Sequence, residues 1–220
     1  MQLITKLLTL SVLTALTARA QLFQQTVNTP IPDGNPTGLS STINVEGLGT
    51  QLLDVTVNLD ISGGSNGDLY AYLSHGGSGF AVLLNRVGKT ATDPFGYGDA
   101  GFHITLSDAA SLDIHNYGGN SGLALTGTWQ PDGRNVNPQL VLDTSPRTAR
   151  FNSFLGSDPN GLWTLVVADM AAGGGQATLQ SWGVDATATP VPEPNASKLF
   201  FLMAVAGLIQ YLRRPSSLSA

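Results

Sequence analysis

The chain has 220 residues, of which 42% are hydrophobic and only 11% charged, and it contains no cysteine. Disulfides and thiolate metal sites are therefore excluded, and one apolar core must hold a domain of this size together. Between residues 21 and 189, 13 aspartates and Glu46 face only five Lys and Arg residues, a net charge of −9. This excludes a nucleic-acid partner, because phosphate binding requires clustered cations.

The first 20 residues have the layout of a secretory signal peptide. A short polar start precedes an apolar run over residues 7–16, and small residues follow at Ala18 and Ala20. This A-x-A ending predicts cleavage after Ala20 and export of the protein. The apolar run is too short to span a membrane comfortably, so a permanent anchor is the weaker interpretation. Residues 21–40 are expected to form a leader ahead of the folded domain.

Alternating apolar and polar residues predict the strands of the middle region. Over residues 53–61 every second side chain is apolar, which places these side chains on one buried face. A glycine-rich turn at 63–67 precedes a second alternating stretch at 69–73, and the two stretches are predicted to pair as a hairpin. Further strands are expected at residues 81–84, 101–106, 123–129 and 139–142.

A second hairpin is predicted near the end of this region. Residues 162–168 and 177–185 flank the turn Gly173-Gly174-Gly175. Trp163 and Trp182 lie on these two stretches and are predicted to be core residues whose indole N–H groups find partners. Many short strands without a helical period indicate an all-β fold, an antiparallel β-sandwich or jelly roll.

Three segments resemble, in order, the P domain (Homo B) of proprotein convertases and bacterial subtilisin-like proteases. They are Asn-Gly-Asp-Leu-Tyr-Ala-Tyr-Leu at 66–73, Ser-Asp-Ala-Ala at 107–110, and Gly-Leu-Trp-Thr-Leu-Val-Val-Ala-Asp at 161–169, with a closing Trp182. The resemblance implies a jelly roll of about eight strands over residues 41–187. It also implies a non-catalytic module, because in that family the P domain stabilises a separate catalytic domain. No such catalytic domain is expected here, since signal, sandwich and tail account for all 220 residues.

Residues 188–220 are expected to form a linker and a sorting tail. Pro192-Glu193-Pro194 precedes an apolar stretch at 199–209, and the basic pair Arg213-Arg214 follows. These parts, in this order, resemble the PEP-CTERM sorting signal of bacterial surface proteins. The resemblance implies a C-terminal hydrophobic helix that anchors the protein in the membrane, with its arginines on the cytoplasmic side, until the protease exosortase processes the tail. A plain membrane anchor is the alternative.

No catalytic constellation is predicted. His75, His103 and His115 lack a neighbouring G-x-S-x-G elbow and lack the paired spacing of zinc ligands. His103 alternates with apolar neighbours and is expected on the exposed face of a strand. The chain is therefore predicted not to be an enzyme.

Calcium is the most plausible metal, because it prefers oxygen ligands and 13 of the 15 acidic residues are aspartates. The candidate ligands are Asp60, Asp68 and Asp169, which the P-domain resemblance places near strand ends. Most aspartates are expected instead to cap turns through their own backbone.

Aromatic residues provide a second functional hypothesis. Tyr70 and Tyr72, on the polar face of their predicted strand, and Trp129 are expected to be exposed, and exposed rings suit sugar stacking, although tyrosine pairs also form by cross-strand packing. The first hypothesis is thus a cell-surface or matrix module that contacts another protein. The second is a calcium-assisted carbohydrate-binding module of an exopolysaccharide matrix, and an accessory domain of subtilisin-like proteolysis is a remote third.

Overall fold

The computed structural model describes residues 18–119 and 121–191, together with residues 205, 206 and 209. The chain divides into two compact units, and the fold described below belongs to the unit of residues 17–190. No helix within the described residues is both long and apolar enough to cross a membrane. The strands are β1 (Arg19–Pro30), β2 (Leu39–Val45), β3 (Leu52–Ser62), β4 (Leu69–His75), β5 (Gly79–Asn85), β6 (Gly101–Ser107), β7 (Leu125–Trp129), β8 (Gly161–Asp169) and β9 (Thr178–Ala188). Three short 3-10 helices connect them, namely η1 (Asn66–Asp68), η2 (Ile114–Asn116) and η3 (Phe151–Phe154).

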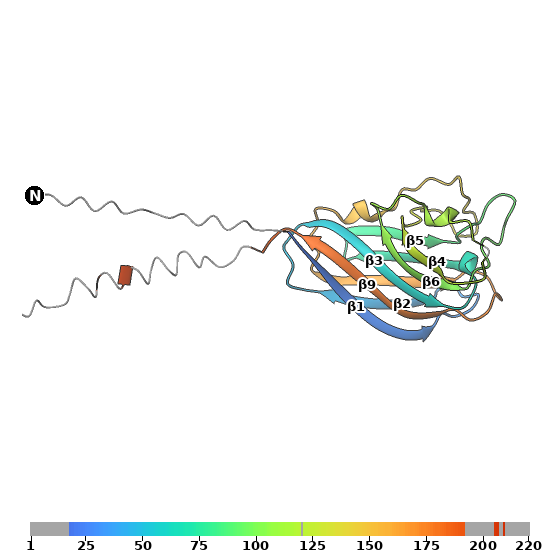
Figure 1. Ribbon diagram of the computed structural model, residues 1–220, viewed down its shortest axis with the longest axis horizontal. Helices are drawn as coiled ribbons and strands as arrows, with labels where there is room; N and C mark the ends of the chain where they lie inside the picture. The colour runs from blue at the N-terminus through green and yellow to red at the C-terminus, as the bar shows by residue number, and fades with distance from the viewer. Residues whose placement is uncertain (1–17, 120, 192–204, 207–208, 210–220) are drawn as a thin grey trace, which may run out of the picture. The chain divides into compact units, whose positions relative to one another are not determined.

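The strands form two sheets around one core (Figure 1). The five-stranded sheet has the order β1-β9-β3-β6-β7, and the four-stranded sheet has the order β2-β8-β4-β5. The pairing is nested, because β1 pairs with β9, β2 with β8, β3 with β6 and β4 with β5. The prediction of an all-β, two-sheet fold is confirmed. The prediction of antiparallel pairing is wrong for one pair, since β6 and β7 run parallel.

The apolar alternation is the main source of the core. Val55, Val57, Leu59 and Ile61 of β3 are each at most 1% exposed. Leu53 also belongs to the predicted apolar series but is 48% exposed, because the register with β9 shifts between Leu52 and Asp54. The bulge turns Leu53 to the solvent side.

Trp163 and Trp182 enter the core from the two different sheets. Their exposed fractions are 0% and 1%. The Trp163 indole N–H donates to the carbonyl of Pro159, and that of Trp182 donates to the Ser41 hydroxyl, both at 2.8 Å. The predicted core positions and indole partners are confirmed.

Both predicted hairpins are wrong, because β3 and β4 lie in different sheets and so do β8 and β9. The glycine turns carry the chain from one sheet to the other. Gly63 has φ of +70°, and a Cβ added there would lie 2.5 Å from the carbonyl oxygen of Gln176, so the two turns pack against each other. Alternation identifies the buried face of a strand but not the strand beside it.

Residues 130–150, called here the edge loop, run along β5 and replace the strand predicted at 139–142. The amide of Gly133 donates to the carbonyl of Val82 at 2.9 Å, and the amide of Val82 donates to the carbonyl of Ala149 at 3.0 Å. These bonds use backbone groups at the outer edge of β5. An open strand edge would otherwise be available to another chain.

The predicted leader, residues 21–40, contributes to the sheet. It contains most of β1 and the start of β2. β1 pairs with β9 from Arg19 opposite Ala188 to Pro30 opposite Thr178. Phe23 and Val27 of β1 pack against the core, which explains why the segment adds a strand and not a loose extension.

Candidate functional site

The outer face of the five-stranded sheet carries a shallow groove of about 400 Å³. We call it the sheet groove. All five strands contribute residues to it. Leu59 and Ile104 also line it, but both side chains are buried in the core. The groove is therefore lined mainly by outward-facing polar side chains.

The strand register aligns the outward-facing residues of this sheet in two rows, of which Thr26, Gly183 and Thr126 do not line the groove. Neighbours in each row are partners in the strand pairing. The first row is Thr26, Ser181, Asp60, His103 and Thr126. The second row is Gln24, Gly183, Asn58, Thr105 and Thr128. Gly183 is buried, and a Cβ added there would lie 3.2 Å from Cδ1 of Leu22, so the second row has no open hollow between Gln24 and Asn58.

Two contacts organise the centre of the groove. The Nδ1 atom of His103 lies 3.6 Å from Oδ2 of Asp60, and the side chains are 76% and 39% exposed. The Thr105 hydroxyl donates to Oδ1 of Asn58 at 2.8 Å. Among the described residues, the Asn58 amide NH2 group makes no hydrogen bond. The groove thus offers both donors and acceptors to a ligand.

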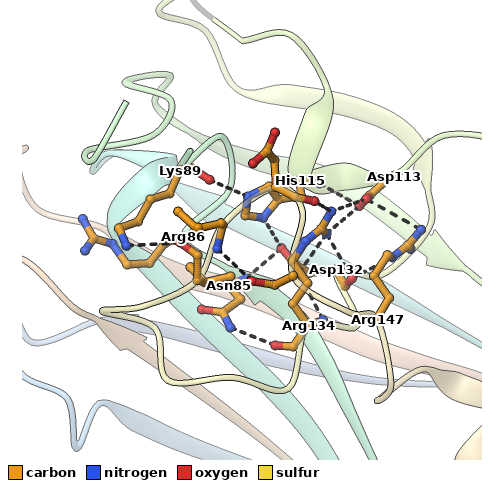
Figure 2. Close-up of polar contacts among 12 residues, drawn as sticks. Asn85, Arg86, Lys89, Asp113, His115, Asp132, Arg134 and Arg147 are labelled. Carbon is orange, nitrogen blue, oxygen red and sulfur yellow. Dashed lines mark hydrogen bonds and ion pairs between the residues drawn. The ribbon is translucent and has the colours of Figure 1, made fainter. Parts of the chain in front are cut away.

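A second polar cluster, shown in Figure 2, joins β5 and its following turn to the edge loop. At its centre is Asp132, which is 0% exposed. Oδ2 of Asp132 lies 2.7 Å from Nδ1 of His115, and Oδ1 accepts from Nη1 of Arg134 at 3.2 Å. Arg134 also pairs with Asp113 at 2.9 Å. We call this the Asp132 network, and its contacts fix the edge loop in place.

The buried histidines are engaged by acceptors on both ring nitrogens. In His115, Nε2 lies 3.0 Å from the carbonyl of Lys89, opposite the contact with Asp132. In His75, Nδ1 lies 3.0 Å from the carbonyl of Leu162 and Nε2 lies 2.7 Å from that of Asp158. The His75 ring also stacks on Trp163, with centroids 4.3 Å apart. Neither ring presents a free nitrogen to a nucleophile, and no serine hydroxyl bonds a histidine ring within the described residues.

The five Lys and Arg side chains of residues 21–189 are all engaged within the fold. Lys89 is only 7% exposed, and its ammonium donates to the carbonyls of Gln139 and Val141 at 2.7 and 3.2 Å. Burial lowers the pKa of Lys89, and the neighbouring Arg86 adds to this effect. The other cations are held by carboxylates or carbonyls: Arg86 by Asp68, Arg134 by Asp113 and Asp132, Arg147 by the carbonyl of Asp132, and Arg150 by Asp108. None of them lines the sheet groove.

The three aspartates predicted as calcium ligands lie in two places. Asp60 is in the sheet groove beside His103. Asp169 lies opposite Leu69 in the pairing of β4 with β8 and therefore near Asp68, which is ion-paired with Arg86 at 3.6 Å. Burial raises the pKa of both Asp68 and Asp169, and the charge of Asp169 raises that of Asp68 further. Within residues 18–119 and 121–191, no group of three His, Asp or Glu side chains is placed to hold a metal ion.

The structure does not bring the predicted aromatic residues together. Tyr70 and Tyr72 lie on the four-stranded sheet, with ring centroids 5.9 Å apart, and Tyr72 contacts Phe80 at 5.2 Å. Tyr70 is half-buried, and this burial raises its pKa. Trp129 belongs to the other sheet, packs against Tyr117 and donates its indole N–H to the carbonyl of Thr126.

The residues predicted for export and sorting are only partly described. Ala18 and Ala20 are exposed, and Ala20 lies in β1 opposite Thr187. Cleavage after Ala20 would therefore place the new N-terminus inside β1. The sorting residues Pro192, Glu193, Pro194, Arg213 and Arg214, and most of the predicted apolar helix, lie outside the described residues.

Sequence reasoning missed most of the sheet groove and all of the Asp132 network. Alternation over residues 53–61 does assign Asn58 and Asp60 to the solvent face, and the apolar neighbours of His103 assign that residue there too. Nothing local indicates that Gln24 and Thr128 complete the same row. The network depends on the edge loop, which has no periodic pattern.

No family model and no curated protein matches the chain. In structure, the chain is similar to a chain in the crystal structure of the Aeromonas sobria serine protease in complex with its chaperone ORF2. The TM-score is 0.43 and the identity 16%, over 79% of this chain and 28% of that one. The crystal structure of the Aeromonas sobria serine protease gives the same TM-score and identity over 77% and 27%. The chain thus spans little more than a quarter of these proteins, and a likeness at this level carries no functional inference.

Proposed function

We propose that this chain is an exported, non-catalytic binding module whose contact surface is the sheet groove. The observation that carries the proposal is the groove of about 400 Å³ to which all five strands of one sheet contribute. Polar rows arise on any solvated sheet face, but a groove along them does not follow from folding alone. A hollow lined by them is a surface on which a ligand can lie.

The contacts in the groove do not support catalysis there. In a nucleophilic triad the histidine lies between the nucleophile and the acid and accepts the proton of the nucleophile through a hydrogen bond. Here the register places His103 between Asp60 and Thr126, but among the described residues no hydrogen bond joins the Thr126 hydroxyl to the His103 ring. The histidine contacts the acid and no hydroxyl, so this arrangement does not activate a nucleophile.

We assign the fold to the jelly rolls of the P-domain kind. Nested pairing of the first strand with the last, the second with the next to last, and so on inward supports this assignment. Here the pairs β1 with β9, β2 with β8, β3 with β6 and β4 with β5 follow that scheme, and β7 is an addition at the edge of the larger sheet. We also propose that the module folds as one β-sandwich around one core.

The delivery of the module to the cell surface also belongs to the proposal. The A-x-A ending at Ala18 and Ala20 supports export, and Pro192-Glu193-Pro194 with its following basic pair supports sorting by an exosortase-type protease at the membrane. Arg19 pairs with Ala188, so the chain enters and leaves the sandwich at one end of β1 and β9. A tether at that end would leave the outer face of the five-stranded sheet open.

The test uses two matched tryptophan substitutions on central strands. Ser181→Trp fills the sheet groove, whereas Thr164→Trp adds the same side chain to the outer face of the four-stranded sheet, where Thr164 lies between Thr42 and Ser74. We expect the full chain and Thr164→Trp to be retained by the extracellular matrix of the host, and Ser181→Trp to be washed off. Equal retention of all three proteins would contradict the groove as the contact surface.

A further inference from the structure

We infer that the ligand of the sheet groove is a neutral polysaccharide chain. The inference rests on the proposed function and adds the chemical class of the ligand. It follows from three properties of the groove: the type of its side chains, the sign of its charge and its length.

The side chains match a surface dense in hydroxyl groups. Amides at Gln24 and Asn58 and hydroxyls at Thr105, Thr128 and Ser181 can each donate and accept hydrogen bonds. Sugar hydroxyls also do both, so each can find a partner along the rows. Asp60 adds a strong acceptor for two neighbouring hydroxyls. The His103 ring, whose side chain is 76% exposed, supplies a flat face for the C–H side of a sugar ring.

Other classes of partner fit the groove poorly. A stable protein interface needs a desolvated apolar centre. The apolar side chains of Leu59 and Ile104 are turned into the core, and Leu22, which is 48% exposed on the edge strand β1, does not line the groove. Nucleic acids and acidic polysaccharides require Lys or Arg side chains, and the five of residues 21–189 are all engaged away from the groove. The acidic balance of the domain repels such polymers further. Of the classes considered, a neutral polar ligand fits the groove best.

The length of the groove favours a chain over a single sugar. The rows cross five strands, and neighbouring strands lie about 4.8 Å apart, so the polar surface extends over about 19 Å. Groups are present along the whole of that distance, from Gln24 on β1 to Thr128 on β7. A monosaccharide would contact only one part of each row.

The experiment measures binding of the full chain to defined linear oligosaccharides by titration calorimetry. The neutral probes are hexasaccharides of β-1,4-glucan, β-1,4-mannan, β-1,4-xylan and α-1,4-glucan, and the anionic control is hexagalacturonate. We expect at least one neutral probe to bind and hexagalacturonate not to bind. Asn58→Ala and Thr105→Ala should each weaken the affinity about 2- to 12-fold, the effect of losing one neutral hydrogen bond. Ser181→Trp should abolish binding, and Thr164→Trp should leave it unchanged.

Three results would overturn the inference. They are failure of all four neutral probes to bind, equal binding of hexagalacturonate, and neutral binding that survives Ser181→Trp but is lost on Tyr72→Ala, which would place the sugar on the four-stranded sheet. The matrix assay separates this inference from the proposed function. If Ser181→Trp still abolishes matrix retention while no probe binds, the ligand class is wrong and the binding surface stands. If retention is also insensitive to Ser181→Trp, both are wrong.

Discussion

Replacing Asp132 by Asn tests whether the Asp132 network holds the edge loop against β5. The substitution preserves size and removes one buried negative charge. Asp132 is fully buried and contacts His115 at 2.7 Å and Arg134 at 3.2 Å. In the variant, His115 and Arg134 would face a side-chain amide, whose oxygen accepts hydrogen bonds but whose NH2 group only donates them.

The size of the expected loss of stability depends on the contacts that Arg134 and His115 keep in the variant. Removing one member of a buried ion pair costs about 3–5 kcal/mol. Arg134 retains Asp113 at 2.9 Å and His115 retains the carbonyl of Lys89, so we expect the lower end, about 3 kcal/mol. For a domain of this size, that corresponds to a fall in Tm of about 6–12 °C. Asp108→Asn is the control, because its pair with Arg150 is partly exposed and should contribute about 1 kcal/mol or less.

Two measurements check the reasoning, thermal unfolding followed by circular dichroism and amide hydrogen exchange. In Asp132→Asn the amides of Val82 and Gly133 should exchange faster than in the wild type, since their bonds join β5 to the edge loop. In Asp108→Asn they should not. The explanation fails if both variants lose the same stability, or if Asp132→Asn is destabilised while these two amides stay as protected as before.

Three further predictions concern the aspartate pair, a glycine turn and the tail. Burial raises the pKa of Asp169, so the contribution of this group to stability is full below the unfolded pKa of about 3.9 and is lost as the pH rises through the folded value. Asp169→Asn should therefore be more stable than the wild type in urea at pH 7. If the difference in unfolding free energy between the two proteins does not narrow towards pH 4, the raised pKa of Asp169 is not its cause. Gly63→Ala should lower the free energy of unfolding clearly more than Gly47→Ala, because a Cβ at Gly63 meets the carbonyl of Gln176 and a Cβ at Gly47 meets no atom within 4 Å. Gly47→Ala should lose only about 1–2 kcal/mol, from its positive φ. Replacing Pro192, Glu193 and Pro194 by alanine should keep the full-length protein in the membrane fraction of a host with exosortase. If the variant is released like the wild type, the motif is not a sorting signal and the tail is only a membrane anchor.

The sequence predicts the buried faces of strands better than their arrangement. The alternation at residues 53–61 and 69–73 identifies β3 and β4 within a residue or two, because burial depends on local period alone. Their assignment to one hairpin is wrong because a glycine turn can reverse a strand or carry it to another sheet. In the structure Gly63 packs against Gln176, a contact between distant turns that no local pattern contains.

The sheet groove is hidden in the sequence for the same reason. Gln24 and Asn58 belong to one row only because Gly183 lies between them in register. That relation joins three segments from the two ends and the middle of the domain, and no local pattern contains it.

The Asp132 network and the sheet groove are connected through charge. Closing the edge of β5 engages Lys89, Arg134 and Arg147 in the edge loop, while Arg86 and Arg150 are paired with aspartates nearby in sequence or space. The five cations of residues 21–189 do not line the groove, and the 14 acidic residues of the same range set the sign of the field. The protection of a strand edge thus bears on which polymers the proposed site would accept. For the proposed neutral ligand, hydrogen bonds suffice and no counter-charge is required.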